Sequence, residues 1–125
     1  MHRSRIGIVL IDHPADRYEA SLAFWAHAAG RQPVSEEGAP YHSLGPLGPV
    51  NLEVQRTGVG TPQRIHLDIE TDDVPAEVAR LRGLGARPVD ERSGYTIMAD
   101  PGGLVFCVVP VQTGETFEQH ATTWE

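Results

Sequence analysis

The sequence contains no lysine, a single cysteine and no long apolar run. All ten of its basic residues are arginine, so mechanisms that form a Schiff base on a lysine are excluded, because the nucleophile is missing. The lone Cys107 cannot form an internal disulfide, and we therefore expect a reducing, cytoplasmic location. No stretch approaches the ~20 apolar residues that cross a bilayer, and the first residues lack the apolar segment of a signal peptide.

Positive charge and aromatic rings are also scarce. The chain has 10 basic against 17 acidic residues, for a formal net charge of −7. Nucleic acids and anionic membranes attract basic surfaces, so we expect neither as a partner. Aromatic residues make up only 6 % of the chain, which is sparse for the walls of a pocket that binds drugs. At 125 residues the chain, 1–125, is expected to fold as one domain.

One pattern occurs twice. Residues 5–12 and 66–73 each form a strand-like run that ends in aspartate, and each leads into a helical stretch that ends at glycine. Two or three short strand-like runs follow each helix, and the second set closes on the turn Asp100-Pro-Gly-Gly103. The repeat predicts an α+β fold of two strand–helix–strands modules, about 5–56 and 64–110. A linker at about 57–63 joins them, and a tail, 111–125, follows.

The helices and the tail give more detailed predictions. Asp16 is expected to cap the first helix, and Asp72 or Asp73 the second. Phe117 and Trp124 indicate that the acidic tail packs against the protein. The predicted buried stripes are Tyr18, Leu22, Trp25 and Ala29 in the first helix, and Val74, Val78 and Leu81 in the second.

Four motifs, in this order, resemble the glyoxalase-like proteins of the vicinal oxygen chelate superfamily. They are Leu22-Ala-Phe-Trp25, Arg64-Ile-His-Leu-Asp-Ile69, the helix 74–85 and Asp100-Pro-Gly-Gly-Leu-Val-Phe-Cys107. That superfamily includes glyoxalase I, extradiol dioxygenases and bleomycin-resistance proteins, and the resemblance covers about residues 5–110. It implies paired βαβββ modules that form a curved mixed sheet around a cup-shaped cavity, a small-molecule ligand and often a homodimer.

The resemblance also implies where a metal would bind. Metal-dependent members place one ligand on the first and last strand of each module, and these positions correspond here to Arg5, Glu53, His66 and Cys107. Arg5 cannot be a ligand, because its guanidinium stays protonated. Cys107 could ligate only as a thiolate, which favours zinc. The four-ligand set is incomplete, so we predict no metal and no other cofactor.

Strand alternation indicates which other side chains face the cavity. If Ile65, Leu67 and Ile69 face the helices, then His66, Asp68 and Glu70 face the other way. The same reasoning directs Arg5, Glu53, Gln55 and Cys107 inward. We therefore predict His66, Asp68 and Arg5 as catalytic residues, and the predicted substrate-binding residues are Glu53, Gln55, Glu70 and Cys107.

Three interpretations of these residues remain open. In the first, no metal binds, Arg5 pairs with Glu53, and His66 and Asp68 are hydrogen-bonding or acid–base groups. In the second, Glu53, His66 and Cys107 bind zinc, although the positive charge of Arg5 would oppose a cation. In the third, Glu70 or water supplies the ligands. Each residue also has a purely structural explanation: His66 as a satisfied strand residue, Cys107 as an apolar wall, and Arg5 with Glu53 as an ion pair.

The sequence favours a metal-independent lyase or isomerase that acts on a small polar or carbonyl compound. A neutral histidine suits proton abstraction beside a carbonyl, and an arginine suits the developing negative charge. Glyoxalase I activity is not expected, because the ligand set is incomplete. The alternatives are a resistance-type protein that binds drugs or natural products without catalysis, a zinc-dependent lyase, and a partner or regulatory module.

Overall fold

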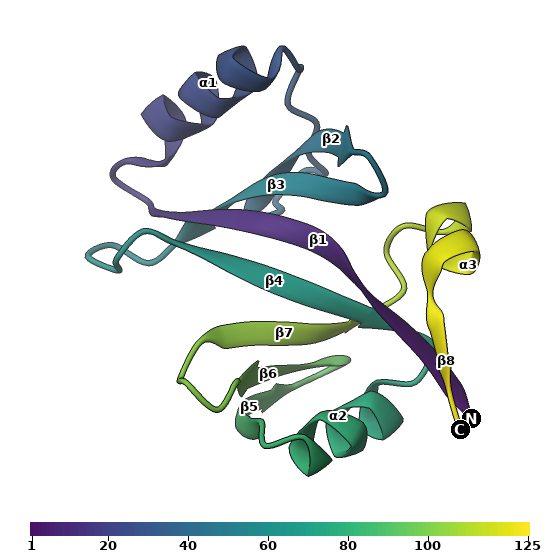
Figure 1. The fold of residues 1–125 in the computed structure, drawn as a ribbon. Helices are drawn as coiled ribbons and strands as arrows, with labels where there is room; N and C mark the ends of the chain where they lie inside the picture. The colour runs from purple at the N-terminus through teal and green to yellow at the C-terminus, as the bar shows by residue number, and fades with distance from the viewer. The chain divides into compact units, whose positions relative to one another are not determined.

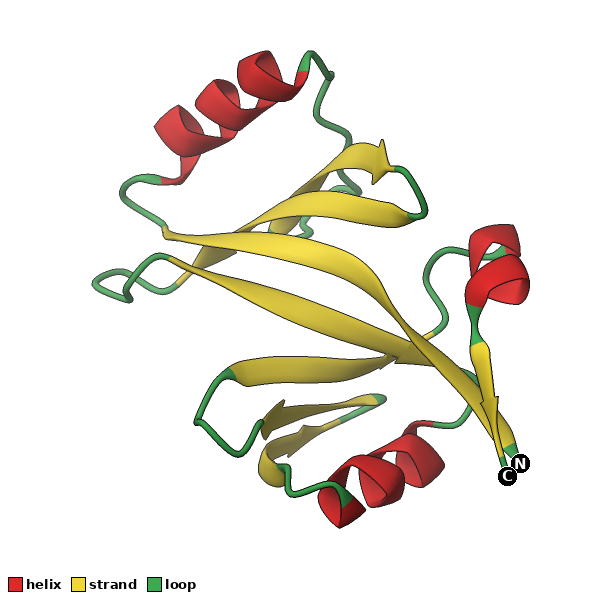
Figure 2. Ribbon diagram, viewed as in Figure 1, coloured by secondary structure: helices red, strands yellow, loops and turns green.

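The computed structural model describes all 125 residues, arranged as strands β1 to β8 and helices α1 to α3 (Figure 1). More residues lie in strands than in helices, and the helices are short (Figure 2). The chain divides into two compact units, Met1–Ile8 with His66–Glu125 as unit 1 and Val9–Ile65 as unit 2. Strand β1, His2–Pro14, contributes residues to both units.

Unit 2 is built on a helix and a β-hairpin. Helix α1 (Tyr18–Ala29) precedes strands β2 (Tyr41–Leu47) and β3 (Val50–Thr57), which pair antiparallel. Val34, between α1 and β2, forms an isolated antiparallel bridge to Ser43. The core of this unit consists of Tyr18, Leu22, Ala26, Leu44, Leu52 and Val54.

The predicted buried stripe of α1 is partly wrong. Tyr18 and Leu22 are buried, but the third buried position is Ala26, and Trp25 is 36 % exposed at the rim, in edge contact with Phe24. Apolar residues occupy positions 22–26 without interruption, so the pattern alone does not determine which side faces the core. The expected cap at Asp16 is also absent, because the helix is preceded by Arg17 with no side-chain cap.

Unit 1 carries the second module. Strand β4 (Arg64–Thr71) continues into helix α2 (Val74–Gly83), and then into β5 (Arg87–Arg92), β6 (Tyr95–Ala99) and β7 (Val105–Pro110). The strand order is β4-β7-β6-β5; β4 and β7 are parallel, and the other pairs are antiparallel. The Asp73 side chain caps α2 by accepting from the Ala76 N–H at 3.0 Å, as predicted. Leu81, Met98, Phe106 and Val108 form the core, with Val74 and Val78 packed against it.

The tail packs within unit 1, as its two rings predict. Helix α3 (Glu115–His120) buries Phe117 completely, and strand β8 (Thr122–Trp124) pairs antiparallel with the start of β1. The two ends of the chain therefore lie side by side in Figure 1. The predicted α+β class with a mixed sheet is confirmed. No helix has the length and apolar character needed to cross a bilayer.

Candidate functional site

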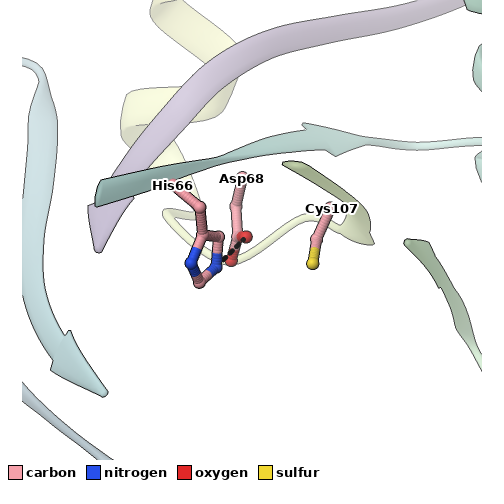
Figure 3. A group of neighbouring side chains, drawn as sticks. All are labelled: His66, Asp68 and Cys107. Atoms are coloured by element: carbon pink, nitrogen blue, oxygen red, sulfur yellow. Dashed lines mark ion pairs between the residues drawn. The ribbon is translucent and has the colours of Figure 1, made fainter. Parts of the chain in front are cut away.

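Three of the predicted site residues meet on one face of unit 1. His66 and Asp68 project from β4 and Cys107 from β7, and one ligand atom from each lies within 4.8 Å of the others (Figure 3). Residues two apart on a strand point to the same face, which places His66 beside Asp68. Asp68 is paired with Cys107 in the parallel register of β4 and β7. The backbone pairing itself thus brings the three side chains together.

The buried His66 faces the Asp68 carboxylate. Its Nε2 lies 3.5 Å from Asp68 Oδ1, with side-chain exposures of 6 % and 15 %. That distance is longer than the 2.7–3.2 Å of an ordinary N–H···O hydrogen bond, and Asp68 Oδ1 is buried without any hydrogen bond. A buried carboxylate oxygen with no hydrogen-bond donor is costly. This oxygen is therefore suited to bind a cation.

Glu70, the third inward position of β4, binds other parts of its own chain. The carboxylate is fully buried and accepts from the Gln112 N–H at 2.8 Å, from the Thr113 N–H at 2.9 Å and from Thr113 Oγ1 at 2.6 Å. Arg5 Nε lies 3.0 Å from its Oε2. Three hydrogen bonds and one ion pair thus hold the Glu70 carboxylate. The structure therefore gives Glu70 a role in anchoring the tail, and the ligand-binding role remains a prediction.

The remaining predicted residues are Arg5, Glu53 and Gln55. The side chain of Arg5 is 7 % exposed, and its guanidinium forms an ion pair with Glu70, a partner that the sequence did not suggest. Glu53 and Gln55 lie on β3 in unit 2, paired with Ser43 and Tyr41 of β2. The predicted Arg5–Glu53 pair and the zinc set of Glu53, His66 and Cys107 stay predictions.

A second polar cluster, which the sequence did not predict, surrounds Glu77 of α2. Its fully buried carboxylate lies 2.8 Å from His2 Nε2 and accepts from Ser4 Oγ at 2.7 Å and from Arg80 at 2.8 and 2.9 Å. Burial, the largest single effect, raises the pKa of Glu77. The hydrogen bonds from Arg80, Ser4 and His2 outweigh burial, so the pKa of Glu77 lies below its ordinary value. The cluster joins α2 to the start of β1.

The chemistry of the His66–Asp68–Cys107 cluster fits a metal ion. An imidazole, a carboxylate and a thiolate are the ligand types that zinc prefers, and the thiolate disfavours magnesium and manganese. Ligand atoms on one tetrahedral zinc lie ~3.3–3.8 Å apart, given bonds of ~2.0–2.3 Å. The His66–Asp68 separation of 3.5 Å already has this value. The cluster therefore does not support the expectation of no metal.

Comparisons with known proteins agree on the fold. Residues 8–109 match the model of a family described as a glyoxalase-like domain. The Mn(II)-bound glyoxalase from Novosphingobium aromaticivorans has a TM-score of 0.58 and 21 % identity, over 88 % of this chain and 40 % of that one. A hypothetical protein from Bacillus halodurans has a TM-score of 0.63 and 13 % identity, over 87 % and 95 % of the two chains.

A third similar structure is a glyoxalase/bleomycin resistance protein/dioxygenase superfamily member from Vibrio splendidus. Its TM-score is 0.53 at 11 % identity, over 89 % of this chain and all 100 % of that one. At such identities the structural likeness shows the fold alone. No curated protein matches this sequence significantly.

Proposed function

Because this chain belongs to the glyoxalase-like domain family, we propose that it is a small-molecule lyase or isomerase in which His66 transfers a proton. The observation that carries the proposal is the buried imidazole of His66, 3.5 Å from the Asp68 carboxylate. Fold membership alone does not specify chemistry. A buried histidine beside a carboxylate, on a strand face, is a recurrent arrangement for acid–base catalysis.

Asp68 has two effects on His66 in this proposal. A carboxylate that faces Nε2 favours a proton on that nitrogen and holds the imidazole in one orientation. The same carboxylate stabilises the imidazolium that forms after proton transfer. Asp68 is therefore a positioning and charge-stabilising residue, and His66 is the group that accepts and returns the proton.

Arg5 has a secondary role in this proposal. Its ion pair with the buried Glu70 holds the guanidinium in place on the first strand. A positively charged guanidinium suits a carboxylate or enolate oxygen of the substrate, because it stabilises negative charge. Arg5 takes the place of one ligand in the four-strand metal set, which is why the proposed proton transfer is metal-independent.

The proposal is tested by solvent deuterium exchange. Metal-free protein is incubated in D2O with a panel of keto acids, hydroxy acids and aldehydes, and the loss of the proton beside each carbonyl is followed by proton NMR. We expect exchange on a subset of compounds, reduced ~100-fold or more by His66→Gln, the usual contribution of a general base. His27→Gln, on the exposed side of α1, is the matched control and should exchange like the unaltered protein.

Two results would contradict the proposal. One is deuterium exchange at an undiminished rate in a folded His66→Gln variant. The other is the absence of exchange on every compound, together with thermal stabilisation by an aromatic natural product, which would favour non-catalytic binding instead.

A further inference from the structure

We propose that His66, Asp68 and Cys107 form a three-ligand zinc site contained entirely in the second module. The site differs from the four-strand set that the resemblance implies, because Asp68 is a ligand and neither Arg5 nor Glu53 takes part. We further propose that zinc and proton transfer compete for His66. This second part rests on the proposed function, whereas the metal site does not.

The backbone holds the three ligands at nearly the right separation. All three ligand atoms lie within 4.8 Å of one another, and the His66 and Asp68 atoms are 3.5 Å apart. Asp68 and Cys107 are paired across β4 and β7, so their side chains start from neighbouring backbone positions. In Figure 3 the imidazole and the carboxylate lie together on one side, and the sulfur of Cys107 approaches them from the neighbouring strand.

The local charges favour a cation. Asp68 Oδ1 is buried, makes no hydrogen bond and lies 3.5 Å from His66 Nε2, so a bound cation would compensate the charge of this carboxylate. The positive charge of Arg5 would by itself repel a metal ion. Its guanidinium lies 3.0 Å from the fully buried carboxylate of Glu70, so the two charges nearly cancel at longer range.

The three ligands favour zinc and would leave one of its coordination positions open. Imidazole, carboxylate and thiolate together favour zinc, whereas magnesium and manganese prefer oxygen ligands. Three protein ligands leave one tetrahedral position for water or another small ligand, which is the composition of catalytic rather than structural zinc sites.

Zinc binding would change the proton on His66. The nitrogen that faces Asp68 is Nε2, and a metal on Nε2 requires the ring proton to sit on Nδ1. With the metal on one ring nitrogen and the proton on the other, the imidazole has no lone pair left to accept a proton. The metal-bound and proton-transferring forms of His66 therefore exclude each other.

Cobalt(II) provides the test, because it replaces zinc and is coloured. Metal-free protein is titrated with cobalt, and we expect a sulfur-to-cobalt charge-transfer band that saturates at one equivalent and disappears when zinc is added. Cys107 is the only cysteine, so a band in the unaltered protein identifies its ligand without any variant. Cys107→Ser should abolish the band, and Asp68→Asn should weaken zinc binding by about tenfold or more. Asp16→Asn, an exposed aspartate, is the matched control.

The outcomes separate the site from the proposed function. A Cys107-dependent band at one equivalent supports the site whether or not any compound exchanges deuterium. The site is overturned by the absence of the band in the folded, unaltered protein, or by zinc affinity unchanged in Cys107→Ser. If the band forms but saturating zinc leaves deuterium exchange at its metal-free rate, the competition for His66 is overturned and the site stands.

Discussion

Trp124 and Ser4 are joined by a hydrogen bond between residues 120 positions apart in the chain. The indole Nε1 donates to Ser4 Oγ at 2.9 Å, and Ser4 Oγ in turn donates to the buried carboxylate of Glu77 at 2.7 Å. The guanidinium of Arg80 lies 3.7 Å from the centre of the indole ring. One residue of the last strand thus connects the first strand to helix α2.

We therefore expect Trp124→Ala to lower the free energy of unfolding by about 2–4 kcal/mol, through loss of the ring packing, the cation–π contact and the hydrogen bond. Trp124→Phe should cost about half as much, because the ring remains. Trp25→Ala, at the more exposed tryptophan, is the control and should cost about 1 kcal/mol or less. Urea unfolding measures all three, and equal losses for both alanine variants would contradict the role of Trp124.

Gly7 is required by its contact with Glu70. A Cβ atom at position 7 would overlap the Glu70 carboxylate, whose contacts hold Arg5 and the backbone of Thr113. We expect Gly7→Ala to destabilise the protein by about 1–3 kcal/mol, the usual cost of overpacking.

Gly83→Ala is the matched glycine control. It lies at the end of α2 with no atom within 4 Å of an added Cβ, so the change should be neutral or stabilising by up to about 1 kcal/mol. Thermal unfolding gives both values. A Gly7→Ala protein as stable as the unaltered one would show that Glu70 can move aside freely.

The Glu77 cluster predicts an acid-sensitive contribution to stability. The pKa of Glu77 is lower in the folded protein than in the unfolded chain, although burial opposes this, because Arg80, Ser4 and His2 stabilise the carboxylate. Its contribution is therefore fully present above the ordinary carboxyl pKa of about 4.3 and is lost as the pH falls through the lower, folded value.

Urea unfolding of the unaltered protein and of Glu77→Gln between pH 7 and pH 3 tests this. The variant should be less stable at pH 7, and the difference should shrink on acidification. Hydrogen bonds from Arg3 also lower the pKa of Asp72 and of Glu118, so both proteins lose stability in acid. A difference that stays constant with pH would show that Glu77 titrates normally.

Cys107 is half-buried and has no disulfide partner. If it ligates zinc, the metal should slow its alkylation by iodoacetamide, by about tenfold when free zinc is ten times its dissociation constant. Magnesium should have no effect, because it does not bind thiolate. Intact-mass measurements over time give the rates, and zinc-independent alkylation would exclude the sulfur as a ligand.

The sequence predicts His66, Asp68 and Cys107 as site residues, but it does not predict that these three lie together. Alternation along residues 65–70 was enough to place His66 and Asp68 on one face, because that pattern depends only on strand geometry. The pairing of Asp68 with Cys107 depends on the register of β4 against β7. These strands are far apart in sequence, and nothing local specifies their alignment.

The structural role of Glu70 is not predictable from the sequence, for a different reason. Two of its donors are the backbone N–H groups of Gln112 and Thr113. Every residue except proline has a backbone N–H, so the residue types at these positions do not reveal such a donor. The predicted buried residues of α1 are partly wrong because the neighbouring apolar residues, Ala23 to Ala26, give several sides of the helix a similar hydrophobicity. Helix α2 has a sharper contrast between faces, and there the prediction was confirmed.

The connectivity of unit 1 determines when it can form during synthesis. Strand β1 is made before the other elements of unit 1, and its partner β8, which pairs with His2 to Ser4, is made after them. Unit 2 is one continuous segment, 9–65, and its core residues are all available while the second module is still being translated. A nascent chain therefore holds the N-terminal end of β1 without β8 until residues 122–124 have been made, and unit 1 cannot be completed before then.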